Sequence, residues 1–196
     1  LYIEITIVYL IVAIINRFTI KMEDNSYCKF VAKLDDDNLH KIYHDTKYGF
    51  AVNDDNELFG RLILEINQAG LSWITILKKE NNFRKAYADF NVKVVAKFNE
   101  KDIQRLLKDP GIIRNKLKVN AAIYNANAIL TVQENFGSFK QWLDFNHPMS
   151  KAEWVKLFKK TFKFTGGEIT NEFLMSIGYL DGAHVPSCPI FKKINN

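Results

Sequence analysis

Beyond Met22 the apolar residues recur at intervals of three and four rather than alternating, a spacing typical of helices. Only four prolines and nine glycines interrupt the pattern. It predicts an all-α fold with helices at 55–67, at a short segment carrying Trp73, Ile76 and Leu77, and at 92–98, 100–107, 115–135, 139–145, 151–161 and 169–177. No repeat, low-complexity tract or linker is present, so we expect residues 22–196 to form one domain, with room for two lobes.

Local signals set several of the predicted boundaries. The first helix should stop before Gly70, and Ser72 is expected to be the N-cap of the short helix that follows. The Asp109-Pro110-Gly111 sequence separates the helices on either side of it, and Gly166-Gly167 forms a turn between the last two.

Residues 1–21 differ from the rest, because Leu1 to Ile15 is almost wholly apolar with Glu4 as its one charge. About 15 residues is short of the roughly 20 that a membrane-spanning helix needs. Met22, which is followed by the polar residues Glu23-Asp24-Asn25-Ser26, is the better candidate for the natural first residue. We expect residues 1–21 to be an upstream extension without importance for function; the alternative is a membrane anchor formed by residues 1–15.

Composition narrows the class of protein. With 196 residues, of which 47% are hydrophobic, the chain can bury a sizeable core, which excludes a disordered or fibrous protein. The formal net charge of +5 favours a polyanionic partner, either nucleic acid or a membrane surface.

Two cysteines and two histidines have the residue types of a metal site. Fifteen residues separate Cys28 from His44, which is not a zinc-finger spacing, whereas His184 and Cys188 lie four positions apart. Two thiolates and two imidazoles form the closed tetrahedral set of structural zinc. A disulfide, or ordinary buried cysteines and surface histidines, would fit the same residues.

Glu65 and Trp73 bracket a predicted helix–turn–helix junction. A carboxylate among Leu64, Ile66 and Leu71 must be solvated or paired, and recognition carboxylates arise in this way. A nucleobase needs a flat stacking surface and hydrogen-bond partners, which Trp73 and Glu65 supply together. The alternative is that Trp73 is a core residue.

The run from Lys163 to Thr170 places two glycines before a helix. Such a turn presents backbone N–H groups to a phosphate, with help from the helix dipole. A plain interhelix turn is the alternative, and Glu168 beside the glycines counts against tight anion binding.

Together these stretches resemble the 3-methyladenine DNA glycosylase I family, over most of the chain from Cys28 to about Cys188. The runs that carry the resemblance are Tyr43-His44-Asp45, Gln68-Ala69-Gly70-Leu71-Ser72-Trp73-Ile74-Thr75-Ile76-Leu77-Lys78-Lys79, Gly111-Ile112-Ile113-Arg114-Asn115 and Phe162-Lys163-Phe164. The Gln68–Lys79 run is long and unusual enough to argue against coincidence.

The resemblance implies a helix-hairpin-helix DNA glycosylase fold whose N- and C-terminal segments are joined by one structural zinc ion. The implied zinc ligands are Cys28, His44, His184 and Cys188. The implied base-binding residues are Glu65, Tyr43 and Trp73, with Glu65 also the catalytic residue. The implied phosphate contacts fall on Lys163, Thr165, Gly166 and Gly167, and backbone contacts of this kind carry no sequence information.

Several positions depart from the family pattern. Phe30 and Tyr48 stand where tryptophans are usual, and both keep an aromatic ring. Asn171 and Glu172 replace a tyrosine and a serine, so that Glu172, like Glu168, adds a carboxylate near the presumed phosphate contacts and is expected to weaken DNA binding. The loop before His184 is one residue longer than usual and lacks an asparagine-aspartate pair.

The implied activity is hydrolysis of the N-glycosidic bond of 3-methyladenine in alkylated double-stranded DNA, by base flipping and without strand cleavage. The family lacks the aspartate that usually follows the hairpin, and Asp181 is interpreted as a loop acid. Lys163 is interpreted as a phosphate contact rather than a Schiff-base lysine. We expect an intracellular monomer, cytoplasmic or nucleoid-associated, with no stable protein partner. The alternatives are a catalytically inactive DNA-binding module, or a glycosylase with altered base preference.

Overall fold

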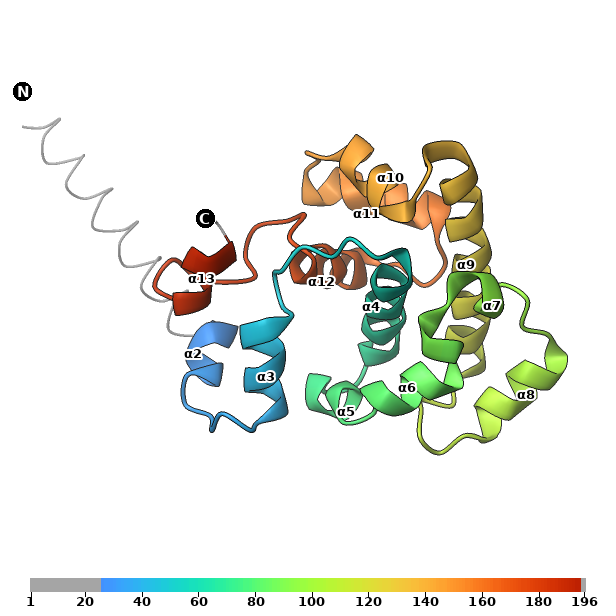
Figure 1. Ribbon diagram of the computed structural model, residues 1–196, viewed down its shortest axis with the longest axis horizontal. Helices are drawn as coiled ribbons and strands as arrows, with labels where there is room; N and C mark the ends of the chain where they lie inside the picture. Colours follow the sequence, from blue (N-terminus) through green and yellow to red (C-terminus); the bar gives the residue numbers. More distant parts are fainter. Residues whose placement is uncertain (1–25, 195–196) are drawn as a thin grey trace, which may run out of the picture. The chain divides into compact units, whose positions relative to one another are not determined.

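The computed structural model describes residues 26–194, and throughout this range the regular structure is helical, with no strand (Figure 1). The expected all-α class is confirmed. The helices are α2 (Tyr27–Val31), α3 (Leu39–Thr46), α4 (Asp55–Gln68), α5 (Trp73–Leu77), α6 (Glu80–Ala86), η1 (Ala88–Phe90), α7 (Val92–Val95), α8 (Glu100–Lys108), α9 (Lys116–Phe136), α10 (Phe139–Asn146), α11 (Lys151–Thr161), α12 (Gly167–Ser176) and α13 (Pro189–Ile194).

The chain divides into two compact units. The described residues of the first are 26–46 and 184–194, and its helices there are α2, α3 and α13. The second, Lys47–Ala183, contains α4 to α12. The expectations for residues 1–21 fall outside the described residues. Within residues 26–194 no helix is both long enough and apolar enough to cross a membrane.

Every helix predicted from periodicity is present, but five others in the described part of the chain were not predicted: α2, α3, α6, η1 and α13. These have three to eight residues, which is too short to show a helical repeat of apolar positions. The helix expected at 92–98 ends already at Val95. Ser72 occupies the expected N-cap position, but its hydroxyl lies 2.8 Å from Thr75 Oγ1 and caps no backbone N–H.

Helix α4 is the central element of the second unit. Leu58, Phe59, Leu62, Ile63 and Ile66 are all almost fully buried, so apolar side chains leave this helix in several directions. Its N-terminus is capped by Asp54, whose side chain accepts a hydrogen bond from the N–H of Glu57 at 2.8 Å.

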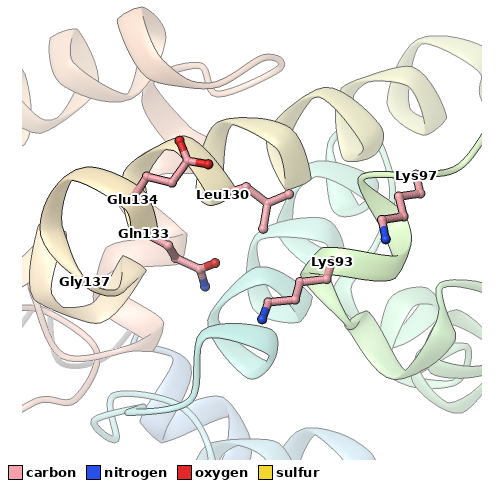
Figure 2. A pocket seen from close by; sticks show the side chains of 6 residues that line it. All are labelled: Lys93, Lys97, Leu130, Gln133, Glu134 and Gly137. Carbon is pink, nitrogen blue, oxygen red and sulfur yellow. The ribbon is translucent and has the colours of Figure 1, made fainter.

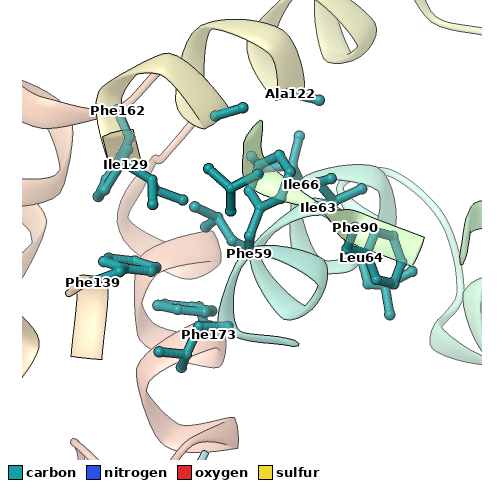
Figure 3. Packing of buried hydrophobic residues seen from close by; sticks show 14 of the residues in the cluster. Phe59, Ile63, Leu64, Ile66, Phe90, Ala122, Ile129, Phe139, Phe162 and Phe173 are labelled. Carbon is teal, nitrogen blue, oxygen red and sulfur yellow. The ribbon is translucent and has the colours of Figure 1, made fainter. Parts of the chain in front are cut away.

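Other helices surround α4 with a continuous core. Figure 3 shows α4 side chains facing Ala122 and Ile129 of α9, while Phe139 of α10 and Phe173 of α12 stack with ring centroids 6.3 Å apart. Gly60 permits the close approach of η1, because a Cβ there would lie 2.3 Å from the Phe90 ring. This packing holds α4 in place, and with it the carboxylate that α4 carries near its C-terminal end.

Candidate active site and metal cluster

Glu65 is a buried carboxyl group in the last turns of α4, with 6% of its surface exposed. None of the residues that the structure describes forms a hydrogen bond with its carboxylate. Burial, followed by the negative charge of Glu172, raises the pKa of Glu65 to about 8, although Arg61 acts in the opposite direction. A carboxyl group with this pKa in a buried position is typical of functional sites.

Glu172 is the second carboxylate of this region and is carried by α12, which packs on α4. Its Oε2 accepts a hydrogen bond from the Tyr48 hydroxyl at 3.3 Å. The backbone next to Tyr48 is also tied to α12, since the N–H of Gly49 donates to the carbonyl of Ser176 at 2.9 Å. Burial raises the pKa of Glu172 and the bond from Tyr48 lowers it.

Arg61 is the cation nearest in sequence to Glu65 and is itself buried, at 7% exposure. Its Nε donates to Glu57 Oε1 at 3.1 Å, and its Nη1 donates to the carbonyl of Lys47 at 3.3 Å. Glu57 Oε2 also accepts a bond from Arg84 at 2.5 Å. The guanidinium of Arg61 is therefore directed toward Glu57, and it only partly offsets the rise that burial causes in the pKa of Glu65.

The turn between Glu65 and Trp73 is held from α9. The Nζ of Lys118 donates to the carbonyls of Asn67 at 3.0 Å and Ala69 at 2.7 Å. These carbonyls are at the end of α4, where helical acceptors lack intrahelical partners. Gly70 has a φ of +83°, which favours glycine, and the turn leads directly into α5 and Trp73. Trp73 is half-buried against the core.

The turn between α11 and α12 is held by hydrogen bonds from helix α9. Asn125 accepts a hydrogen bond from the N–H of Lys163 at 2.7 Å and donates to the carbonyl of Lys163 at 3.0 Å. The Thr165 hydroxyl is buried and donates to the carbonyls of Phe158 and Phe162. The Thr165 side chain therefore stabilises the turn, and only its backbone remains for an external ligand.

No other part of the protein covers the two glycines of this turn on the side where a side chain would stand. A Cβ at Gly166 or Gly167 would meet no atom within 4 Å. Beside them, the Lys163 ammonium lies 5.1 Å from the ring centroid of Tyr124, and the Lys118 ammonium lies 5.9 Å from that of Phe164. Tyr124 and Phe164 are 46% and 38% exposed. Cations beside exposed rings are well suited to the phosphates and bases of nucleic acid.

The four predicted metal ligands come together within the first unit. Their ligand atoms all lie within 4.8 Å of one another, and all four residues are buried. The Nε2 of His44 lies 3.1 Å from the Nδ1 of His184, and Cys188 Sγ lies 3.8 and 3.7 Å from these nitrogens. Cys28 Sγ is 3.6 Å from His184 Nδ1. Both cysteines are thiols, so the disulfide alternative is wrong.

These distances fit a tetrahedral ion. With metal–sulfur and metal–nitrogen bonds of about 2.3 and 2.05 Å, tetrahedral ligand atoms lie about 3.5 Å apart for a sulfur–nitrogen pair and about 3.3 Å apart for two nitrogens. Asp45 Oδ1 lies 2.6 Å from His44 Nδ1, a carboxylate–histidine contact that leaves Nε2 to act as ligand. Burial, with the neighbouring Cys188, raises the pKa of Cys28 to about 11. A bound divalent cation would lower this pKa again, because it stabilises the thiolate.

A cavity of about 600 Å³ in the second unit is separate from all these residues. Figure 2 shows its lining by Lys93, Lys97, Leu130, Gln133, Glu134 and Gly137. None of the predicted site residues lines it. Gln133 is already engaged, since its amide donates to Asp55 Oδ2 at 2.6 Å. The cavity mixes two cations with one anion and has no feature that selects a ligand.

With the site geometry known, comparison with other proteins decides the family. The sequence profile of the methyladenine glycosylase family matches residues 33–153. This chain belongs to the methyladenine glycosylase family. The resemblance inferred from the sequence is thus confirmed. The matched stretch includes Tyr43, His44, Glu65 and Trp73, whereas Cys28 and the residues beyond 153 lie outside it.

Individual members of the methyladenine glycosylase family match over most of the chain. DNA-3-methyladenine glycosylase 1 of Escherichia coli K12 is 36% identical over 171 residues, covering 78% of this chain and 91% of that protein. DNA-3-methyladenine glycosylase of Haemophilus influenzae is 34% identical over 172 residues, covering 78% and 92%. The structure of 3-methyladenine DNA glycosylase I from Staphylococcus aureus superimposes with a TM-score of 0.72 at 30% identity, covering 80% of this chain and 93% of that chain.

The predicted site residues are distributed over both units. Glu65, Trp73 and the α11–α12 turn lie in the second unit, and the four metal ligands lie in the first. Tyr43 also belongs to the first unit, where it is buried on α3 beside His44, and its role in base binding stays a prediction. Asp181 is exposed in a loop, as expected of a loop acid.

Sequence reasoning missed Lys118 and Asn125, and it did not relate Glu172 to Glu65. Lys118 and Asn125 lie on the buried face of α9 with Ala121, Ala122 and Ile129, and a polar residue within an apolar helical stripe was the available signal. Glu172 was expected only to add a carboxylate near the presumed phosphate contacts; in the structure its carboxylate accepts a hydrogen bond from Tyr48, and its negative charge contributes to the raised pKa of Glu65.

Proposed function

We propose that this protein is a monofunctional DNA glycosylase that hydrolyses the N-glycosidic bond of 3-methyladenine in alkylated double-stranded DNA. The observation that carries the proposal is Glu65, a buried carboxyl group with no hydrogen-bond partner among the described residues. It is followed by the turn to Trp73, which a hydrogen bond from Lys118 stabilises. The names of its relatives, DNA-3-methyladenine glycosylases at 34–36% identity, support the same substrate.

Recognition follows from the charge of the substrate. Methylation at N3 makes the purine of the nucleotide cationic and weakens its glycosidic bond. The nucleotide flips out of the duplex, and Glu65 accepts hydrogen bonds from the base while Trp73 stacks on its ring. Tyr43 is proposed as a further hydrogen-bonding partner of the base. A carboxylate in a buried site stabilises a cationic base far more than it stabilises neutral adenine.

The chemical step needs little help from the protein. Water adds to C1′ of the sugar, the bond to the base nitrogen breaks, and the electron pair leaves with the base, which departs neutral. The proton from water passes to solvent. No lysine forms a bond to the sugar in this scheme, so strand cleavage is not expected.

DNA is proposed to contact the second unit through the α11–α12 turn. The open backbone at Gly166 and Gly167, together with that of Thr165, offers N–H groups to a phosphate, and Lys163 adds a positive charge. Glu168 is 83% exposed on its side chain and pairs with Lys151 at 3.2 Å, which reduces its repulsion of the phosphate backbone. These contacts position the duplex and do not read its sequence.

The metal cluster is proposed to hold one structural zinc ion through Cys28, His44, His184 and Cys188. Two thiolates and two imidazoles at these distances form a complete tetrahedral set. Zinc held in this way stabilises the fold and has no open position for an activated water. The residues that bind the base and the sugar therefore act without it.

The test is release of free bases from alkylated duplex DNA by the full chain, measured by chromatography. Selective release of 3-methyladenine that falls at least about 100-fold in Glu65→Gln would support the proposal, since an electrostatic recognition group contributes on this scale. Glu100→Gln, an exposed glutamate on α8, is the matched control and should retain wild-type activity. A folded protein that binds duplex DNA but releases no base would instead be a DNA-binding module.

A further inference from the structure

Phe164 has a backbone conformation that is unusual for a residue with a side chain. Its φ is +62°, in the left-handed region that favours glycine, and it lies in the turn between α11 and α12. A buried hydroxyl closes the chain around it, since Thr165 Oγ1 donates to the carbonyls of Phe162 at 3.3 Å and Phe158 at 3.1 Å. Such strain persists only where the surrounding structure enforces it, and it is concentrated at functional sites.

The ring that this conformation presents lies against a lysine of another helix. The Nζ of Lys118, on α9, is 5.9 Å from the centroid of the Phe164 ring, within the range of a cation–π contact. Lys118 is itself 5% exposed, and burial lowers the pKa of its ammonium group. A buried ammonium group needs partners that stabilise its charge, and the ring of Phe164 is one of them.

The other partners of Lys118 are the backbone carbonyls that end α4. Its Nζ donates to the carbonyl of Asn67 at 3.0 Å and to that of Ala69 at 2.7 Å. These two bonds fix the start of the turn that leads into Trp73 at the beginning of α5. One ammonium group within the second unit therefore contacts both the turn before Trp73 and the turn between α11 and α12.

The nearby contact between Tyr124 and Lys163 differs from that of Phe164. Lys163 is exposed, and its ammonium lies 5.1 Å from the centroid of the Tyr124 ring, so this cation is free to leave the ring for a phosphate. The ammonium of Lys118 is held by two hydrogen bonds and cannot turn outward without breaking both. The contact between Phe164 and Lys118 is therefore part of the framework of the base site, although Phe164 belongs to the turn proposed to contact DNA.

We propose that Phe164 is a positioning residue of the base site. Its ring, presented by a left-handed backbone, holds the Lys118 ammonium on the carbonyls that end α4 and so fixes the turn that carries Trp73. This inference rests on the proposed function. The turn that offers N–H groups to a phosphate thus also builds the site for the flipped base, and loss of the ring should weaken base binding rather than duplex binding.

The first test is hydrogen exchange of the empty full chain, followed by NMR at the amide of Leu71, which donates to the carbonyl of Gln68 at 2.7 Å. Phe164→Leu keeps an apolar side chain without the ring and should speed exchange of this amide about fivefold, the size expected for a partly buried cation–π contact. Phe164→Tyr keeps the ring and should match wild type. Phe98→Leu removes a ring that lies 5.3 Å from the Arg105 guanidinium and should leave this amide unchanged. An unchanged Leu71 amide in Phe164→Leu would overturn the inference.

The second test compares binding of the free base with binding of the duplex. Phe164→Leu should bind free 3-methyladenine about fivefold more weakly, measured by fluorescence, while its affinity for undamaged duplex DNA stays that of wild type. Phe164→Gly should behave in the same way, because glycine adopts a positive φ without strain and leaves the turn intact. Weaker duplex binding with unchanged base binding would make Phe164 a DNA contact and contradict the inference. If wild type binds no methylated base while the Leu71 amide still exchanges faster in Phe164→Leu, the proposed function has failed and the link through Lys118 stands.

Discussion

Replacing Glu65 with glutamine should stabilise the folded protein, even though it removes the proposed recognition group. The pKa of Glu65 is about 8 in the folded protein, against 4.5 for an unperturbed glutamate. The folded state therefore binds this proton more tightly than the unfolded chain does. The stability that the bound proton contributes is complete below pH 4.5 and is lost progressively as the pH rises toward 8. Glutamine has the same shape and never has to lose a proton.

The size of the effect follows from these two pKa values. At pH 7 the ionisation of Glu65 in the unfolded chain lowers the free energy of unfolding by about 3 kcal/mol, and at pH 5 by about 1 kcal/mol. Urea unfolding of wild type and Glu65→Gln at both pH values measures the difference. The variant should be more stable at both, with a gain about 2 kcal/mol larger at pH 7.

The pH dependence is the decisive part of this experiment. A glutamine that only repacks the site would change stability by the same amount at pH 5 and pH 7. Equal gains at the two pH values, or a variant less stable at pH 7, would refute the idea that Glu65 is a destabilised carboxyl group. Glu100→Gln should show no such pH-dependent gain, because Glu100 is exposed.

Three further predictions concern the metal cluster and helix α9. Cys188→Ala should abolish stoichiometric zinc binding, measured by elemental analysis. It should also lower Tm by about 10 °C, if loss of the ligand lowers the free energy of unfolding by about 3 kcal/mol. An unchanged Tm together with loss of zinc would contradict a structural role. Lys118→Met should lower the free energy of unfolding, measured in urea, by about 2 kcal/mol, because the carbonyls of Asn67 and Ala69 lose their donor. Activity per folded molecule should fall as well. Lys116→Met, at an exposed position of the same helix, should change neither stability nor activity. Asn125→Ala should weaken duplex binding several-fold, since it removes both hydrogen bonds that hold the backbone of Lys163. Binding of free 3-methyladenine, detected by fluorescence, should stay unchanged. A loss of both would indicate general misfolding.

Periodicity predicted the long helices because each of them buries an apolar stripe. Helix α9 is an example, with Val119, Ala122, Ala126 and Ile129 at helical spacing and all buried. The short helices α2 and α3 gave no such signal. They carry Cys28 and His44, two of the proposed metal ligands, and here residue types predicted the cluster while the helices themselves went unpredicted.

The candidate site was predictable only where the identity of a residue reveals its role. Glu65 stood out because it is a carboxylate among apolar neighbours. The effect of Glu172 on its pKa was not predictable, because the two residues lie on helices that are far apart in sequence and are brought together only when α12 packs on α4. The same holds for Lys118, whose acceptors are backbone carbonyls that no sequence pattern identifies.

The metal cluster also has a consequence for how the protein is made. Two of its ligands lie near the start of the described chain, and the other two follow the whole of the second unit. A ribosome therefore completes Lys47–Ala183 before it supplies His184 and Cys188, so this middle stretch can fold while the first unit still lacks half of its ligands. The set of four side chains is therefore complete only after Cys188 has been added, and a chain terminated just before this residue would lack one member of the cluster.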